Sequence, residues 1–411
     1  MISIGIVPSQ PFHLSLGTDM RLLSLMKSLL KMDAEVHFIT PFKTDIIPKS
    51  ERLFVHSPIR SKLSSEAIEK IYSLTRTFFN KSIFTKNFVC NETFLNWMTN
   101  YFADKIYKLI KKSDIDIVLG ELEIASMALI KLRKSLEVPV ITDIHGAWSE
   151  EMIAAHLIKE NSRQAGIIRK FEKKIFQGAD AVIVVSDDAK EFFKKFYDVP
   201  EKKMTVVPCG AFPRINEARK VENPSNIVFS GTVTYREHVD LLIKSMPYVL
   251  KEYPSAKLYI TNKGDKLHEI VSLASRLNIN LGLFYYPALS DDYFNFLKAC
   301  HIGILTSSYD LPRKIAYPAK LFDYMSVGMP VVANDVGAWT RIISENNIGI
   351  VTKDSPREFA YALIKLLKNP DLAYECGQRG LNLLRTRFNY DISAKIFYDL
   401  CKTIINRSNG G

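Results

Sequence analysis

Short apolar runs alternate with longer amphipathic stretches through the first half of this chain. Strands are predicted at residues 2–7, 34–40, 53–55, 115–120, 138–143, 181–185 and 204–208. The stretches between them, including 19–30, 91–112 and 124–135, are predicted helices. Strands that alternate with helices form βαβ units, which build a parallel sheet with its ligand site at the carboxyl ends of the strands.

The same alternation restarts after a polar stretch with two prolines, residues 210–225, which reads as a linker. Strands are predicted at residues 226–230, 256–261, 283–286, 302–305, 330–333 and 349–351, and the remainder to residue 405 is predicted to be helical. A chain of 411 residues is too long for a single core. We therefore expect an α/β protein with two Rossmann-like domains, at residues 1–208 and 226–385, joined by a linker at 209–225.

Composition narrows the class of protein. No apolar run approaches the ~18 residues that span a bilayer, and the N-terminus reads as a strand and not as a signal peptide. The five cysteines are scattered with no C-x-x-C pair, which indicates a reducing cytosol and no structural zinc. A net charge of +11 favours anionic partners, and the absence of zinc-finger and aromatic RNA-binding signatures argues against nucleic acid.

The stretch from Pro318 to Asn334, P-A-K-L-F-D-Y-M-S-V-G-M-P-V-V-A-N, carries the most specific chemical signal. It predicts a short helix that begins after Pro318 and ends at Gly328, followed by a buried strand. Lys320 and Asp323 share a helix face, with Lys320 in the first turn, where free N–H groups attract an anion. A phosphate at Lys320 and a ribose diol at Asp323 would describe a nucleotide, whereas the simpler alternative is a solvated ion pair.

This stretch resembles the donor-binding helix of the retaining GT-B glycosyltransferases of family four (group 1), roughly P-x-K-L-x-E-Y-M-A-x-G-x-P-V-V-A. Asp323 stands at the position of the family's Glu. The resemblance implies a first domain for the acceptor, a second domain for a nucleotide-sugar donor and a C-terminal helix, residues 386–411, that packs back on the first domain. It further implies sugar transfer without a metal ion, and no cofactor beyond the nucleotide-sugar substrate. The donor-binding residues that it implies are Gly231, Thr232, Arg236, Gly264, Pro287, Lys320, Leu321 and Asp323.

Candidate catalytic residues follow the strand at 138–143, in the sequence D-I-H-G-A-W-S-E-E. His145 resembles the family's sugar-contacting histidine, and it could hydrogen-bond a sugar hydroxyl or stabilise developing charge. A retaining enzyme of this family needs no protein nucleophile, whereas an inverting variant would need a base, for which Asp143 and Glu150 are candidates. The first-turn acids of a helix would also explain Glu150. Glu172 to Ser186 and the string V-V-P-C-G resemble further family elements.

Three positions depart from the family pattern. Thr232 and Glu237 stand where the family has the Arg and Lys that hold the diphosphate, and Ile315 stands where it has a sugar-contacting acid. Arg236, Lys320 and Arg313 are candidate replacements for the two cations, and Asp310 for the acid. The alternative is that the site no longer binds a nucleotide diphosphate.

Other features allow two interpretations each. Gly17, before the helix at 19–30, allows close approach of a phosphate, or simply a turn. Residues 59–90 are basic and rich in phenylalanine, and residues 161–178 combine an apolar stripe with a basic face. Both suit contact with an anionic membrane or a lipid-linked acceptor, or else a core-facing stripe with a solvated opposite face.

The sequence therefore predicts a glycosyltransferase that moves a sugar from a nucleotide-sugar to a hydroxyl of a glycan or lipid-linked acceptor, with retention. We expect it in the cytoplasm, including the inner face of the membrane. A catalytically inactive GT-B scaffold is the main alternative, motivated by Thr232, Glu237 and Ile315. A nucleotide-sugar epimerase of the same fold is a further alternative.

Overall fold

A computed structural model describes residues 1–10, 17–42, 44, 47, 50–57, 90–287 and 290–409. Nearly all of the basic, phenylalanine-rich segment at 59–90 lies outside the described residues. The chain divides into two compact units: unit 1 contains Met1–Pro208 and Ser393–Gly411, and unit 2 contains Cys209–Ile392. Among the described helices, none has the length and apolar character that crossing a bilayer requires.

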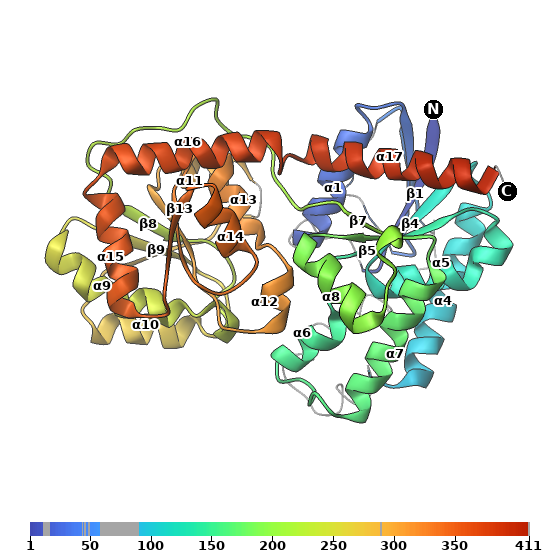
Figure 1. The fold of residues 1–411 in the computed structure, drawn as a ribbon, viewed down its shortest axis with the longest axis horizontal. Helices are drawn as coiled ribbons and strands as arrows, with labels where there is room; N and C mark the ends of the chain where they lie inside the picture. The colour runs from blue at the N-terminus through green and yellow to red at the C-terminus, as the bar shows by residue number, and fades with distance from the viewer. Residues whose placement is uncertain are drawn as a thin grey trace. The chain divides into compact units, whose positions relative to one another are not determined.

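Unit 1 is built on one parallel sheet of seven strands in the order β3-β2-β1-β4-β5-β6-β7 (Figure 1). Its strands are β1 (Ile2–Pro8), β2 (Ala34–Ile39), β3 (Leu53–His56), β4 (Ile117–Glu121), β5 (Val140–Ile144), β6 (Ala181–Val184) and β7 (Met204–Val206). Its helices are α1 (Gly17–Leu29), α4 (Glu92–Ile110), α5 (Leu122–Leu136), α6 (Trp148–Ala154), α7 (Arg163–Gly178), α8 (Asp187–Tyr197), the 3-10 turn η1 (Glu201–Lys203) and most of α17 (Tyr390–Asn409). The chain runs outward from β1 to β3 and then returns to β4, so the strand order reverses between β1 and β4.

Unit 2 repeats this plan with six parallel strands in the order β10-β9-β8-β11-β12-β13. Its strands are β8 (Asn226–Phe229), β9 (Lys257–Thr261), β10 (Leu281–Phe284), β11 (Ile302–Leu305), β12 (Val331–Asn334) and β13 (Gly349–Thr352). Its helical elements are η2 (Tyr235–Glu237), α9 (Val239–Glu252), α10 (Leu267–Arg276), α11 (Asp291–Lys298), α12 (Leu311–Ile315), α13 (Ala319–Ser326), α14 (Trp339–Glu345), α15 (Pro356–Leu367) and α16 (Pro370–Thr386). Here the order reverses between β8 and β11. The two predicted Rossmann-like sheets are confirmed.

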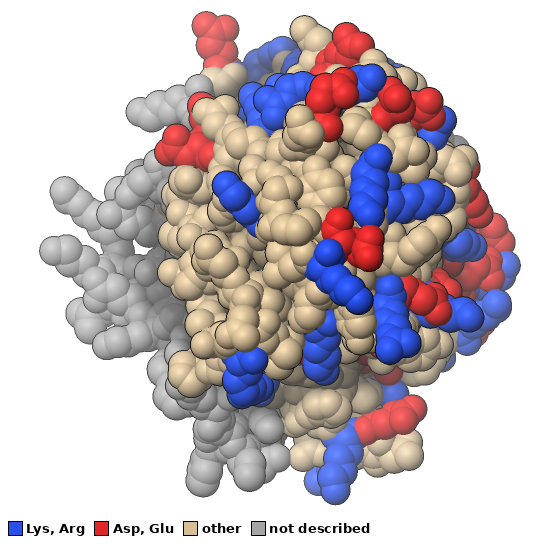
Figure 2. Space-filling model, turned by 90° about the vertical axis from the view of Figure 1, so that its left-hand side faces the viewer, with Lys and Arg blue, Asp and Glu red and all other residues tan. Residues whose placement is uncertain are grey.

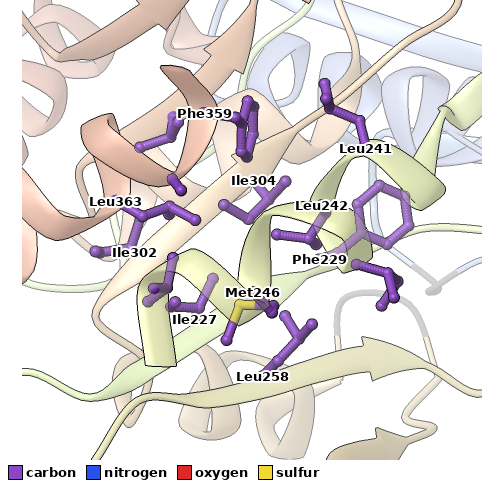
Figure 3. Packing of buried hydrophobic residues seen from close by; sticks show 14 of the residues in the cluster. Ile227, Phe229, Leu241, Leu242, Met246, Leu258, Ile302, Ile304, Phe359 and Leu363 are labelled. Carbon is purple, nitrogen blue, oxygen red and sulfur yellow. The ribbon is translucent and has the colours of Figure 1, made fainter. Parts of the chain in front are cut away.

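Apolar side chains from both helices and strands fill the core of unit 2. Figure 3 shows Leu242 and Met246 of α9 and Phe359 and Leu363 of α15 packed around strand residues such as Ile304. All five are almost completely buried, and side chains of this kind each contribute about 1.5–3 kcal/mol when removed from water. This core fixes the strand ends from which the candidate site is built.

The segment at 209–225, predicted as a linker, packs along unit 2. Its Ala211 N–H donates to Phe388 O at 3.0 Å, and its Arg214 N–H donates to Ser326 O at 2.9 Å. The last helix returns to unit 1, where Tyr398 Oη donates to Asp33 O at 3.0 Å and Ser393 Oγ to Pro208 O at 2.9 Å. In Figure 1, α17 runs along unit 1.

Two local features bear on the sequence predictions. The segment before Pro318 contains the short helix α12, and the Asp310 side chain caps it by accepting the Arg313 N–H at 3.0 Å. In α7, the apolar stripe that includes Ile168, Phe171 and Ile175 is buried in the core of unit 1. That stripe is therefore not a membrane-facing surface.

Among the described residues on the face that Figure 2 shows, charged side chains of both signs are mixed and form no continuous basic stripe. Exposed ion pairs such as Lys368–Glu252 and Lys244–Asp240 occur on unit 2. A nucleic-acid surface needs clustered Lys and Arg, so this face is not of that kind.

Candidate functional site

Ligands of open parallel sheets bind beyond the strand ends at the point where the strand order reverses. In unit 2 this point lies between β8 and β11. The chain leaves β8 through Gly231 and η2, and it leaves β11 toward α12, whose N-cap is Asp310. Most of the predicted donor-binding residues follow these two strands or begin α13.

Three ion pairs join these segments. Arg236 donates to both oxygens of Asp310, through Nε to Oδ2 at 2.9 Å and through Nη2 to Oδ1 at 3.0 Å. Glu237 accepts from Lys320 Nζ at 2.5 Å through Oε2 and from Arg313 Nη2 through Oε1. All three cations proposed from the sequence are thus gathered near one another, and each faces a carboxylate.

The ion pair between Glu237 and Lys320 is mostly buried. The side chains of Glu237 and Lys320 are 13% and 12% exposed. Burial alone would raise the pKa of Glu237, but Lys320 and Arg313 outweigh it and hold that pKa below its ordinary value. Burial lowers the pKa of Lys320, an effect that Glu237 partly offsets. Glu237 is therefore ionised at neutral pH.

Two glycines permit the close packing of this region. Gly231 has a φ of +137°, and a Cβ there would lie 2.9 Å from Lys320 Nζ. Gly264 has a φ of +135°, and its Cβ would lie 2.0 Å from Val233 O. Side chains at these positions would be strained and would clash, so Gly231 lets the backbone approach Lys320 and Gly264 lets it approach Val233.

One turn further along α13, the Asp323 carboxyl accepts from Tyr293 Oη at 3.0 Å, and that hydroxyl also bonds Ser230 Oγ at 2.7 Å. Burial raises the pKa of Asp323 to about 6, against the lowering effect of Tyr293 and Arg214. Asp323 thus lies next to Ser230, which directly follows β8, and has a hydrogen-bonded tyrosine as its partner.

The remaining predicted donor-binding residues lie apart from the ion pairs. Leu321 is fully buried in the core, and its N–H donates to Pro318 O, so it can affect a ligand only by positioning α13. Thr232 is exposed, and Pro287 O accepts from Ser290 N. Gly17 begins α1 and belongs to unit 1.

In unit 1 the candidate catalytic residues lie near the end of β5, which contains Asp143, and in the segment after it. Asp143 is fully buried and accepts from Arg21 Nε at 3.1 Å and from Arg21 Nη2 at 3.3 Å, while His145 Nε2 lies 3.3 Å from its Oδ2. Burial alone would raise the pKa of Asp143, but Arg21 and His145 outweigh it and lower that pKa. Asp143 is consequently a weak base, suited to holding His145 and Arg21 in place.

Glu150 is separated from this pair by its own partner. Its Oε1 accepts from Arg169 Nη2 at 2.7 Å and from Arg169 Nε at 3.0 Å. Because Arg169 occupies this carboxylate oxygen, the geometry does not favour Glu150 as the base of an inverting reaction.

Sequence reasoning missed Glu121, which lies at the point of strand reversal in unit 1. It ends β4 opposite Pro8 of β1 and is 1% exposed, and its Oε2 accepts from Ser9 N at 3.3 Å. Its Oε1 has no hydrogen-bond partner among the described residues. Burial raises the pKa of Glu121 to about 7, so it can exchange a proton near neutral pH. The sequence could have indicated Glu121 as a site residue, because it directly follows the apolar strand predicted at residues 115–120.

Glu172 was also missed as an individual residue. Its carboxyl accepts from Trp148 N at 2.7 Å and from Tyr197 Oη at 2.6 Å, so it caps the start of α6. Burial raises the pKa of Glu172 to about 7. It positions the helix that follows His145.

We expect unit 1 to lose stability as the pH rises from about 4.5 to about 7, because Glu121 has a higher pKa in the folded protein than its ordinary 4.5. The folded state then binds more protons than the unfolded state in this window. The loss approaches about 1.4 kcal/mol per pH unit for one such group. Urea unfolding at a series of pH values measures it.

In that experiment, E121Q should flatten the slope relative to the wild type. The control E191Q changes an exposed glutamate of α8 that pairs with Lys195 and should leave the slope unchanged. Parallel stability curves for the wild type and E121Q would contradict the expected protonation of Glu121.

Two parallel-sheet units, each with polar side chains at its point of strand reversal, define the GT-B class of glycosyltransferases. Family models match consecutive parts of the chain: Glycosyltransferase Family 4 at residues 17–212 and Glycosyl transferases group 1 at residues 213–382. The chain belongs to this family of GT-B glycosyltransferases, as the sequence motifs predicted.

Similar proteins agree with this assignment. An uncharacterized glycosyltransferase of Methanocaldococcus jannaschii is 27% identical over 46% of this chain and 51% of its own length. The matched regions span about half to two thirds of the first curated relatives. The solved sucrose-phosphate synthase of Thermosynechococcus elongatus has 16% identity and a TM-score of 0.75, covering 99% of this chain and 100% of that chain. Alr3699/HepE of Anabaena, solved in complex with UDP, has 12% identity and a TM-score of 0.67 over 98% of this chain and 100% of that chain.

Proposed function

We propose that this protein transfers a sugar from a nucleotide-sugar donor to a hydroxyl of a glycan or lipid-linked acceptor, with retention at the anomeric carbon. The observation that carries this proposal is the position of Lys320. It lies in the first turn of α13, at the point of strand reversal in unit 2. It packs beside Gly231, where a side chain would collide with the Lys320 ammonium group.

Each residue has a distinct proposed role. Lys320 and Arg313 stabilise the negative charge that builds on the leaving phosphate, with help from the positive end of the α13 dipole. Asp323 accepts a hydrogen bond from a ribose or sugar hydroxyl in exchange for that of Tyr293. In unit 1, His145 contacts a sugar hydroxyl in an orientation that Asp143 maintains.

Incubation with radiolabelled UDP-, GDP- and ADP-sugars and lipid-linked acceptors tests the activity, and NMR of the product tests retention. Transfer to an acceptor hydroxyl supports the proposal. Free epimerised sugar nucleotide without acceptor would indicate the epimerase alternative instead. If neither diphosphate-linked nor monophosphate-linked sugar donors give transfer or hydrolysis with any acceptor, the proposed activity is contradicted.

A lipid-linked acceptor would bring the protein to the cytoplasmic face of a membrane. Co-sedimentation with vesicles that contain anionic lipid, with and without the acceptor lipid, tests that location. Vesicle binding that depends on the acceptor lipid is the expected result.

A non-catalytic scaffold is the second candidate, and one observation favours it. Arg236, Arg313 and Lys320 all face carboxylates, which weakens their attraction for a phosphate. Calorimetry with nucleotides separates the two candidates, because a scaffold that has lost the donor site binds none of them.

A further inference from the structure

The cluster of ion pairs in unit 2 has an unusual charge balance for a site that receives phosphate. It combines three cations, Arg236, Arg313 and Lys320, with two carboxylates, Glu237 and Asp310, which leaves one net positive charge. Nearby Asp323 interacts with its own cation, Arg214. The exposed Thr232 adds no charge.

Glu237 is fixed in this cluster by its backbone as well as its side chain. Its N–H donates to Thr234 O at 3.1 Å, and its carbonyl oxygen accepts from Thr306 Oγ1 at 2.7 Å. Both carboxylate oxygens are paired, and the side chain is mostly buried. Withdrawing the carboxylate from Lys320 and Arg313 would leave a buried charge without partners, which is strongly unfavourable. A ligand therefore binds beside Glu237 and does not displace it.

The cations keep hydrogen-bond donors for such a ligand. Within the described residues, Glu237 is the hydrogen-bond partner of Lys320 Nζ and takes one of its three N–H groups. Arg313 Nε is buried and has no hydrogen-bond partner in the described part of the chain. A buried donor of this kind calls for an unseen acceptor, and an oxygen anion between Arg313 and Lys320 would supply one.

We propose that Glu237 is a permanent internal anion of this site, and that the site selects a donor whose sugar is attached through a phosphodiester with a single negative charge. This inference rests on the proposed sugar transfer and names the class of donor. One phosphodiester anion would bring the cluster to neutrality. The second charge of a diphosphate would lie near Glu237 in a poorly screened region, where like charges repel strongly.

The group transfer balances with such a donor. The bond between the anomeric carbon and the phosphate oxygen breaks, and a bond between that carbon and the acceptor oxygen forms. The proton of the acceptor hydroxyl passes to the released phosphate monoester. The phosphodiester can come from a nucleoside monophosphate or from a prenyl monophosphate, since both present the same anion to the cluster.

Calorimetric titration of the full chain tests the inference with three probes that carry the same sugar. The first probe is a nucleoside diphosphate sugar, and the second is the matching nucleoside monophosphate sugar; both are made with uridine, guanosine and cytidine. The third probe is a citronellyl phosphate sugar. Each probe is made once with glucose and once with mannose. We expect the wild type to bind a phosphodiester at least about tenfold more tightly than the diphosphate. E237Q, which removes the internal anion, should shift this ratio at least about tenfold toward the diphosphate.

The variant E252Q is the matched control, because Glu252 pairs with Lys368 on the surface of unit 2 and should leave the ratio unchanged. The ratio of phosphodiester affinity to diphosphate affinity in the wild type tests the inference even if E237Q fails to fold. Tighter binding of the diphosphate by the wild type overturns the inference but leaves sugar transfer intact, as does a ratio that E237Q does not change. Absence of binding by every probe overturns both the inference and the proposed function. The tighter of the two phosphodiesters identifies the source of the donor.

Discussion

Replacing Lys320 with methionine is expected to lower the rate of sugar transfer by about 10²–10³-fold, the typical effect of removing one preorganised donor from a transition-state anion site. Methionine retains most of the side-chain length and the contact with Phe229, whose ring centre lies 4.0 Å from Lys320 Nζ. The loss should therefore be mainly electrostatic. Steady-state measurement of kcat/KM with the donor identified by the titrations checks it.

Lys368 provides the control for this prediction. It is 49% exposed and pairs with Glu252 at 2.9 Å on the surface of unit 2, so K368M removes the same charge away from the site. Transfer by K368M should stay close to the wild-type rate. If folded K320M kept more than about a tenth of the activity, Lys320 would not have the role assigned to it.

Replacing Arg21 with methionine is expected to destabilise unit 1 by about 3–5 kcal/mol, because it leaves the buried Asp143 carboxylate without its cation. The two side chains are 1% and 0% exposed. Arg21 also donates to Pro208 O at 3.0 Å and Val207 O at 2.8 Å, and R21M leaves these carbonyl groups without those bonds. Urea unfolding followed by tryptophan fluorescence measures the change, since Trp97 and Trp148 both lie in unit 1.

R133M is the corresponding surface control. Arg133 is 50% exposed and pairs with Asp180, and loss of such a pair typically costs less than about 1 kcal/mol. The double variant R21M/D143L, which removes both buried charges, should regain part of the stability lost in R21M. Equal stability of R21M and R133M would show that the buried pair contributes little.

The sequence predicted the fold well because each element has a strong local signal. Apolar runs of β-branched residues mark strands such as β6 and β12, and the stripes of α7 follow a helical period. The position of Lys320 in the first turn of a helix also followed from local signals, since Pro318 and Gly328 delimit that helix. These features depend on neighbours in the chain and are readable without tertiary contacts.

The partners of the candidate residues could not be predicted in this way. Glu237 and Lys320 are far apart in sequence, and so are Arg21 and Asp143, so only the folded sheet determines which carboxylate meets which cation. The same holds for Glu121, whose raised pKa results from burial that the sequence does not display. The candidate residues could therefore be named from the sequence, whereas their partners and charge states could not.

The order in which unit 1 is assembled along the chain has a consequence for synthesis. Its sheet is complete at Pro208, but Ser393, Ala394 and Cys401 of α17, all fully buried, are translated only after the whole of unit 2. At a usual elongation rate of about 5–20 residues per second, the nascent sheet waits for roughly ten seconds or longer with that surface uncovered. During this interval the growing polypeptide presents apolar surface to which a chaperone can bind, and the first unit is completed only after the second has been synthesised.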